Sequence, residues 1–344
     1  MIRGTCARRG RISLLALMAA VAGLAGVAGS AQAAAPTISL TPVGPAGAKG
    51  YFVYTAQGGS RVHGQVSLVN TSAVKGTVML YTVDATTGQT TGAVYLSRAR
   101  RRLDVGAWTK LPVRRVVLGS HGRAVVSFTV RVPRGVRGGQ HLGAIVAQPV
   151  SPVRRVTAHR GSHAFHINVQ ALSVLAVQVN VPARPVERMA VNACRAGGPH
   201  GFQTLFIGMG NTGNQFVKGT GSMTVSNGAG RAVKRQTFTL DTFLPGTSIN
   251  YPVVLSGKPL SAGHYHAVVS LAYGNGHRHL SRALACNVSS HSIVQVFGAA
   301  NAAQITRPGG SSGPSVVVIV LGGIALLGLG FGAAMLLTRR AQHG

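Results

Sequence analysis

Acidic residues are almost absent from this chain. Of 344 residues only four are Asp or Glu, against 34 Lys or Arg, which gives a formal net charge of +30. Calcium sites and paired-carboxylate catalysis need several carboxylate oxygens at one place, so four scattered acids argue against both. Asp84 is expected to cap the following turn at residues 86–88. The sequence instead predicts a surface that attracts nucleic acid, anionic lipid or charged wall polymers.

Motifs for nucleophilic catalysis and for phosphate cradling are also missing. The sequence contains no Gly-x-Ser-x-Gly elbow and no glycine-rich phosphate loop followed by a helix. Two histidine pairs, His264 with His266 and His277 with His279, could each place both rings on one strand face. A turn at 275–276 would put the pairs at opposite ends of a hairpin, which argues against a combined metal site. We therefore expect a protein that is not an enzyme and has no metal and no cofactor.

Cysteine is scarce, with three residues in the chain. Cys6 falls in the N-terminal leader described below, which leaves Cys194 and Cys286 as an even pair in an oxidising exterior. We expect one disulfide between them, with a reactive thiol as the less favoured alternative. It would close a loop of about 90 residues and, in the chain-entropy model, stabilise the fold by roughly 4 to 5 kcal/mol.

The N-terminus has the order of a secretory signal peptide. Four arginines within residues 3–11 precede an apolar run at 12–27, and Ala-Gln-Ala follows at 31–33. We expect cleavage after Ala33, so that residues 1–33 are removed. An uncleaved N-terminal anchor is the alternative, but the apolar run is shorter than the ~20 residues that a membrane span needs.

The C-terminal region predicts a membrane anchor. Residues 315–337 are uncharged and apolar or small without interruption, and their length suits a hydrocarbon core of about 30 Å. The arginines at 339–340 follow at once, so the positive-inside rule predicts a cytoplasmic tail at 338–344 and an extracellular remainder. With the chain outside the cell, and without interleaved aromatics, nucleic acid is not an expected partner.

Strand patterns dominate the rest of the chain. Apolar residues occupy every second position in 124–132 and on one parity in 167–181, and Gly- and Asn-rich turns separate such runs. No segment between leader and anchor has convincing helical periodicity. We predict an all-β fold of two tandem immunoglobulin-like β-sandwich domains plus a C-terminal transmembrane helix. The sandwiches are assigned to 34–183 and 184–290, and a Ser-, Ala-, Gly- and Pro-rich stalk to 291–314.

An ordered series of segments in the first domain resembles a known family. The segments are 51–52, 66–72, 80–85, Trp108, 126–133 and 138–146. In this order they resemble the N-terminal peptidoglycan-binding domain of WxL-interacting proteins, which are surface proteins of Gram-positive bacteria. The family layout of signal peptide, two β-sandwiches and one C-terminal transmembrane helix is similar as well. The resemblance implies that the first domain binds peptidoglycan, while the second domain, which matches less well, is associated with host-derived ligands in some members.

The candidate ligand-binding residues are one aromatic residue and a group of arginines. Trp108 could stack on a sugar, although the apolar parity continued by Leu111 and Val113 favours a core position. Arginine binds phosphate and carboxylate groups with two parallel hydrogen bonds, so clusters at strand ends predict either a shared anion-facing rim or an ordinary solvated basic surface. The residues assigned to ligand binding are Trp108, Arg100, Arg101, Arg102, Arg114 and Arg115.

Together these features predict a membrane-anchored bacterial cell-surface protein that binds peptidoglycan or an associated anionic wall polymer. The alternative is a scaffold or adhesin that recruits other surface proteins or host ligands through exposed sheet edges. Binding to a polyanion should weaken as ionic strength rises, whereas recruitment of a protein partner need not.

Overall fold

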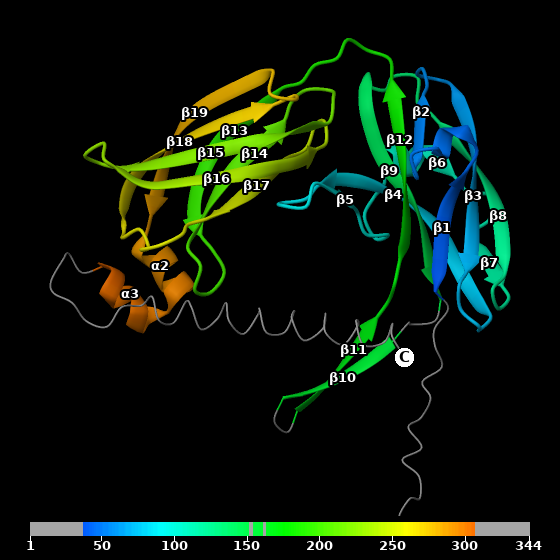
Figure 1. Cartoon of the computed structure of the whole chain (residues 1–344), viewed down its shortest axis with the longest axis horizontal. Helices are drawn as coiled ribbons and strands as arrows, with labels where there is room; N and C mark the ends of the chain where they lie inside the picture. The colour runs from blue at the N-terminus through cyan, green and yellow to red at the C-terminus, as the bar shows by residue number, and fades with distance from the viewer. Residues whose placement is uncertain (1–36, 151–153, 161–162, 307–344) are drawn as a thin grey trace, which may run out of the picture.

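The computed structural model describes residues 37–150, 154–160 and 163–306. In this part the chain is all-β, and its strands form two successive sandwiches (Figure 1). The predicted signal peptide at 1–33 and the predicted transmembrane helix at 315–337 lie outside the described residues. Within them, the helices are too short or too polar to cross a membrane.

The first sandwich packs two sheets around an apolar core. Its strands are β1 Ile38–Val43, β2 Phe52–Thr55, β3 Arg61–Asn70, β4 Gly76–Thr87, β5 Ala93–Tyr95, β6 Thr109–Lys110, β7 Arg115–Leu118, β8 Arg123–Arg131, β9 Gly139–Pro149 and β12 Ser173–Val181. One sheet has the order β1-β3-β8-β6, and the other has the order β2-β12-β9-β4-β5 with β7 also paired to β4. Two short helical turns, η1 Pro45–Gly47 and α1 Val105–Trp108, lie between strands.

The alternation expected in 124–132 is confirmed in β8. Val126, Phe128 and Val130 are buried, while Ser127 and Arg131 are exposed. The side chains of a strand point alternately to its two faces, so this strand presents one face to the core and one to solvent.

The apolar residues expected at every second position across 167–181 belong to two separate strands. Strands β10 Arg154–Arg160 and β11 His163–Val169 pair with each other in a hairpin that extends away from the sandwich (Figure 1). Residues 170–172 are exposed and separate this hairpin from β12, which pairs with β9 and β2 in the core. A pattern with period two does not reveal where one strand ends and the next begins on the same parity.

The second sandwich has seven strands in two sheets. They are β13 Met189–Gly197, β14 Thr204–Asn211, β15 Val217–Asn227, β16 Ala232–Phe243, β17 Ser248–Val254, β18 Gly263–Tyr273 and β19 Arg278–Val288. The sheets have the orders β13-β14-β17 and β16-β15-β18-β19. In the β18–β19 hairpin, His266 is opposite Ala285 and His279 is opposite Ala272. The two histidine pairs therefore lie toward opposite ends of the hairpin.

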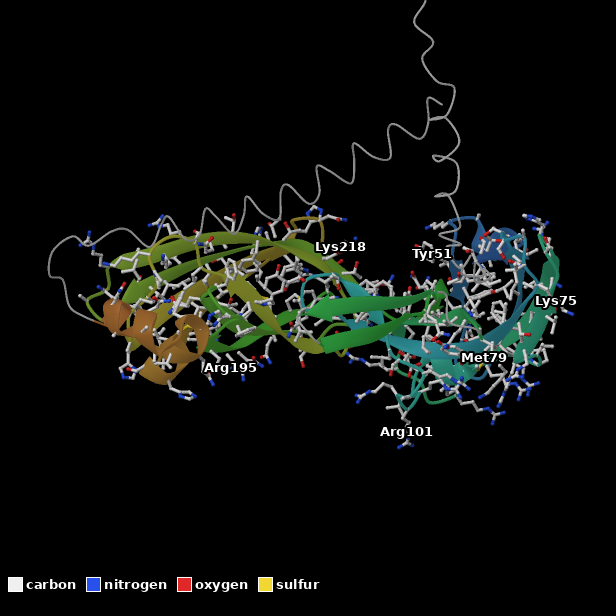
Figure 2. All side chains as sticks on the ribbon, turned by 90° about the horizontal axis from the view of Figure 1, so that it is seen from below. Tyr51, Lys75, Met79, Arg101, Arg195 and Lys218 are labelled. Atoms are coloured by element: carbon white, nitrogen blue, oxygen red, sulfur yellow. A yellow bond between two sulfur atoms is a disulfide. The ribbon has the colours of Figure 1, made fainter. Side chains whose placement is uncertain are left out.

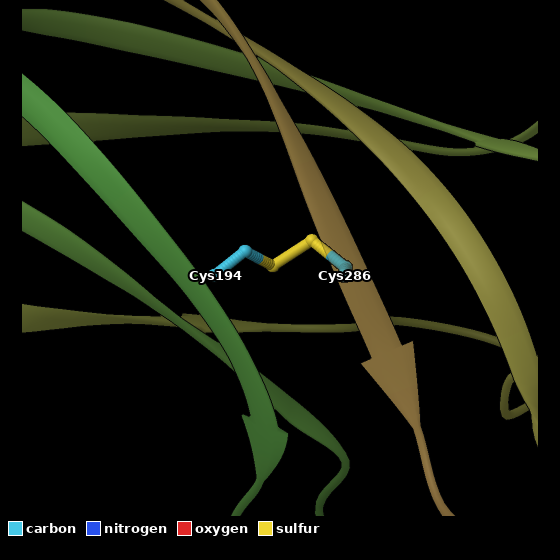
Figure 3. Close-up of a disulfide and its surroundings, with 2 residues drawn as sticks. All are labelled: Cys194 and Cys286. Carbon is cyan, nitrogen blue, oxygen red and sulfur yellow. A yellow bond between two sulfur atoms is a disulfide. The ribbon is translucent and has the colours of Figure 1, made fainter.

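A disulfide joins Cys194 in β13 to Cys286 in β19 (Figure 3). The two Cα atoms are 5.2 Å apart and the residues are separated by 92 positions. Cys286 is 1% exposed. The bond therefore crosses from one sheet to the other and links the first strand of this sandwich to its last.

Two helices follow the last strand where the sequence predicted an unstructured stalk. They are α2 Ser290–Phe297 and α3 Ala299–Thr306. The hydroxyl of Ser289 accepts a hydrogen bond from the Ser292 N–H at the start of α2, and Ile293 and Val296 are buried against the second sandwich. Helices of eight residues are shorter than the window in which helical periodicity can be recognised, which is why the sequence analysis missed them.

Turns of the second sandwich contact strand ends of the first. The Gln140 N–H donates to the Asn214 carbonyl at 2.8 Å, and the Phe216 N–H donates to the Gln140 side-chain oxygen at 2.6 Å. Beside them, the Leu244 N–H donates to the Thr87 hydroxyl at 2.9 Å. The ends of β4 and β9 are therefore held against the second sandwich by hydrogen bonds.

The disulfide generates the first testable prediction. Replacing both cysteines, Cys194→Ser with Cys286→Ser, should lower the free energy of unfolding of the second sandwich by about 2 to 5 kcal/mol, because the unfolded chain regains the freedom of a long loop. Denaturant unfolding of the oxidised protein and of the double variant measures the difference. Equal stability of the two proteins would contradict the prediction.

Candidate functional site

A short segment between β5 and α1 concentrates positive charge. It brings exposed arginines next to the start of β7, around two adjoining cavities of about 250 and 460 Å³. The two cavities share Arg98, Arg102 and Lys110. We call them together the arginine cleft, defined by Arg98, Arg100, Arg101, Arg102, Lys110 and Arg114.

Two of the guanidinium groups are held in place by side chains of β4. The Arg98 guanidinium lies 5.3 Å from the centre of the Tyr81 ring and donates to the Met79 sulfur at 2.6 Å. Arg102 donates to the Thr82 hydroxyl at 2.7 Å. Burial raises the pKa of Tyr81, and the charge of Arg98 opposes that rise in part. Both arginines are therefore oriented before any ligand arrives, which reduces the entropy lost on binding.

A buried carboxylate fixes the chain that follows the arginines. Asp84, 6% exposed, accepts hydrogen bonds from the backbone N–H groups of Leu103, Asp104 and Gly106. The prediction that Asp84 caps the turn at 86–88 is wrong. Its side chain reaches a loop about 20 positions further along the chain, a contact that only the packing of that loop against β4 creates.

The cations of the cleft are not neutralised within the described part of the protein. The ion pairs found there are His141 with Asp104 and Lys218 with Asp241, and neither includes a cation of the arginine cleft. The described residues that line the cleft include no Asp or Glu. Figure 2 shows Arg101 projecting away from the ribbon of the first sandwich. An anion entering the cleft would therefore meet several unpaired donors.

The structure brings together four of the six residues assigned to ligand binding, namely Arg100, Arg101, Arg102 and Arg114. Arg115 is exposed on β7 but lines neither cavity. Trp108 is 6% exposed and packs in the first core, with its ring 4.8 Å from that of His141. This is the core position that the apolar parity favoured, and it leaves little of the ring exposed to a sugar.

Lys110 is a member of the cleft that sequence reasoning missed. It lies in the two-residue strand β6, which pairs with β8, and its side chain is exposed. A lone lysine in so short a strand produces no pattern in the sequence. The nearby Arg114 and the arginine run at 100–102 were the only features of the sequence that could have indicated that Lys110 belongs to a basic site.

The Asp104 and His141 pair resembles two of the three members of a catalytic triad, but its geometry indicates a structural role. The two ring nitrogens of His141 face the Asp104 carboxylate at 2.9 Å and the Arg137 carbonyl at 2.8 Å. Burial lowers the pKa of His141, but the hydrogen bonds to Asp104 and Arg137 outweigh it and leave the pKa raised. Acceptors at both nitrogens favour the protonated ring, and neither nitrogen is free for a substrate proton.

The described residues contain no group of three His, Cys, Asp or Glu side chains that could hold a metal ion. The side chain of Arg137, which precedes β9, donates to the carbonyls of Thr212 and Gly213 in the second sandwich. It therefore takes part in the contact between the sandwiches and is not available to the arginine cleft.

Comparison with known proteins finds similarity in architecture alone. No family model and no curated protein sequence matches this chain. The class 5 fimbriae chaperone CfaA is 11% identical with a TM-score of 0.35, covering 72% of this chain and 99% of its own. A chain of the CsuC–CsuE chaperone and tip adhesion subunit complex from Acinetobacter baumannii is 10% identical with a TM-score of 0.35, covering 74% and 100%. At these values no functional argument rests on the likeness.

The role of Asp84 leads to a prediction about stability. Asp84→Ala should lower the free energy of unfolding by roughly 3 to 5 kcal/mol, because three backbone N–H groups lose their charged acceptor. The matched control is Asp241→Ala, whose exposed carboxylate should cost little. Chemical unfolding of both variants measures the difference, and equal losses would contradict the role assigned to Asp84.

The His141 environment predicts a pH dependence. Because the folded-state pKa is raised above the unfolded value of about 6.5, protonated His141 stabilises the fold fully below that pH. This stabilisation is lost as the pH rises through the folded-state pKa. His141→Gln should abolish that part of the pH profile. Unfolding free energies measured from about pH 5 to about pH 9 test this, and a difference between wild type and variant that is constant with pH would refute it.

Proposed function

We propose that this protein is a non-catalytic cell-surface protein that binds an anionic polymer of the bacterial cell envelope in its arginine cleft. The proposal is carried by one observation: six cations line two adjoining cavities with no carboxylate among the described lining residues. The predicted signal peptide and C-terminal anchor support a location outside the cell, where wall polymers are the abundant polyanions.

The chemistry of the cleft selects phosphate or carboxylate groups. A guanidinium presents N–H donors in a planar fork that matches both groups, and Arg98 and Arg102 are already oriented by β4. In a polymer that repeats such groups, any of the repeated phosphate or carboxylate groups can occupy the cleft. This ligand class includes peptidoglycan carboxylates and the phosphate-bearing polymers attached to the wall.

The lining of the cleft also favours binding without turnover. Hydrolysis of a wall polymer needs a general acid and base, most often a carboxylate or histidine of tuned pKa. The described lining residues include no Asp, Glu, His or Cys. A ligand in the cleft would therefore be retained and not cleaved.

Charge reversal at two exposed cleft residues tests the proposal. Arg100→Glu with Arg101→Glu should weaken binding to intact cell walls by about 10- to 100-fold, because charge-assisted hydrogen bonds become repulsions. Sedimentation of the full-length protein in detergent with purified walls, across a salt series, measures the affinity. Wild-type binding should fall as salt increases, since exposed charges are screened.

The matched control is Arg231→Glu with Arg235→Glu, which makes the same charge change on exposed residues of the second sandwich. It should leave wall binding close to wild type. Equal losses in the two double variants would assign binding to overall charge instead of to the cleft. Wall binding that does not weaken at any salt concentration would contradict an anionic polymer as the ligand.

A further inference from the structure

The second sandwich has two unlike ends. One end is bonded to the first sandwich through Asn214 and Leu244. The other end carries helices α2 and α3, the last described elements, which finish at Thr306 (Figure 1). Strands β15, β18 and β19 run between the two ends, and their eleven residues at ~3.4 Å each separate the ends by about 35 Å. We call the end that carries the helices the α2 end.

Three segments meet at the α2 end and are held together by hydrogen bonds. The Gly201 N–H donates to the carbonyl of Val296 in α2 at 2.7 Å, and the Leu255 N–H, just after β17, donates to the Gln203 carbonyl at 2.8 Å. The side chain of Gln203, which is 4% exposed, also exchanges hydrogen bonds with the backbone of Leu260. The loop between β13 and β14 is therefore fixed between α2 and the segment that follows β17.

Each of these segments leaves an apolar side chain in solvent. Phe202 in the loop is 50% exposed, Val254 at the end of β17 is 52% exposed, and Val294 in α2 is 41% exposed. Single exposed apolar residues are ordinary on a protein surface, but these three lie on segments that are bonded to one another. An apolar partner that covered them would remove their surface from water, which is favourable.

The α2 end is also basic, without an acid among its described residues. Arg195 and Lys258 are exposed there, and Figure 2 shows Arg195 close to the two helices, in the strand β13 against which α2 packs. The two carboxylates of the second sandwich lie toward the opposite end. Glu187 comes just before β13, and Asp241 lies near the end of β16, where it pairs with Lys218. A partner that fits the α2 end therefore combines an apolar region with negative charge.

The predicted membrane anchor follows directly from this end. The span predicted at 315–337 begins nine positions after Thr306, and nine residues reach at most about 30 Å when fully extended. So short a tether keeps the membrane at a high effective concentration around the α2 end. A bilayer with anionic headgroups offers both the apolar region and the negative charge that this end lacks.

We infer that the α2 end docks onto the anionic membrane in which the chain is anchored. Phe202, Val254 and Val294 then lie at the level of the lipid headgroups, and Arg195 and Lys258 lie against lipid phosphates. Amphipathic helices bind lipid interfaces through the same combination of apolar and basic residues. Docking would fix the second sandwich against the membrane and, through the bonded joint, orient the first sandwich with its arginine cleft. This inference rests on the predicted anchor and not on the ligand of the cleft.

Fluorescence quenching in nanodiscs tests the docking. The only native tryptophan, Trp108, is 6% exposed in the first core. The full-length Phe202→Trp variant in phosphatidylglycerol nanodiscs should lose roughly half of its added emission when the acyl chains carry bromine, because an interfacial side chain reaches the headgroup and acyl boundary. The matched control is Val268→Trp, 43% exposed in the middle of β18, whose emission should not change. Equal quenching of both variants, or of neither, would overturn the docking.

The contribution of charge is measured in the same assay. Adding Lys258→Glu to the Phe202→Trp variant should lower the docking equilibrium about fivefold or more, because a basic residue at an anionic surface becomes a repelled acid. The matched control, Arg282→Glu on an exposed position of β19, should leave the quenching unchanged. Replacing phosphatidylglycerol with phosphatidylcholine should weaken docking as well. Quenching that responds neither to Lys258→Glu nor to lipid charge would overturn the assignment of anionic headgroups.

Failure of the anchor and failure of the docking give different results. A full-length protein that does not enter nanodiscs at all would overturn the predicted anchor and this inference together. A protein that enters them, but whose Phe202→Trp emission bromine does not quench, would retain the anchor and overturn the docking. A blue-shifted emission without quenching would show that a protein surface, such as a second copy of this chain, covers the α2 end instead of lipid.

Discussion

Carboxylates are so scarce in this chain that most of its arginines and lysines lack an acidic partner. Asp84 accepts three backbone hydrogen bonds, Asp104 faces His141, and Asp241 faces Lys218. Each of these acids is already engaged within the fold. The arginines within residues 98–102 therefore have no carboxylate partner among the described residues, and Asp84 holds the loop that follows them. A fold with few acidic residues thus has a local excess of positive charge that an external anion can neutralise.

Strand β4 links this charge to the rest of the molecule. Its side chains orient two arginines through Tyr81 and Thr82, its residue Asp84 fixes the loop beyond them, and its end at Thr87 is bonded to the second sandwich. One rigid strand in the middle of a sheet therefore positions the cleft and joins the two sandwiches. A site supported by a strand retains its geometry better than one carried by a free loop.

The sequence was most informative where a physical pattern is local. The period of two in 124–132 predicts β8, because alternate side chains of a strand face core and solvent. The eight-residue helices after Ser289 were not predicted, because helical periodicity cannot be recognised in so short an element. The separation of β11 from β12 was not predicted either, because the apolar pattern keeps the same parity across the break between the two strands. In the candidate site, the arginine run was visible and the apolar parity already favoured a core position for Trp108, but the membership of Lys110 was not visible.

The all-β class, the excess of positive charge and the presence of one cysteine pair follow from the sequence alone, because composition and alternation can be seen without knowing the fold. Tertiary packing was needed to show which arginines share a cleft, which loop Asp84 holds, and that Arg61 faces Arg131. These features depend on strand register and on loops packing against strands distant in sequence. Register is set by the packing of whole sheets, so no local pattern of residues can reveal it.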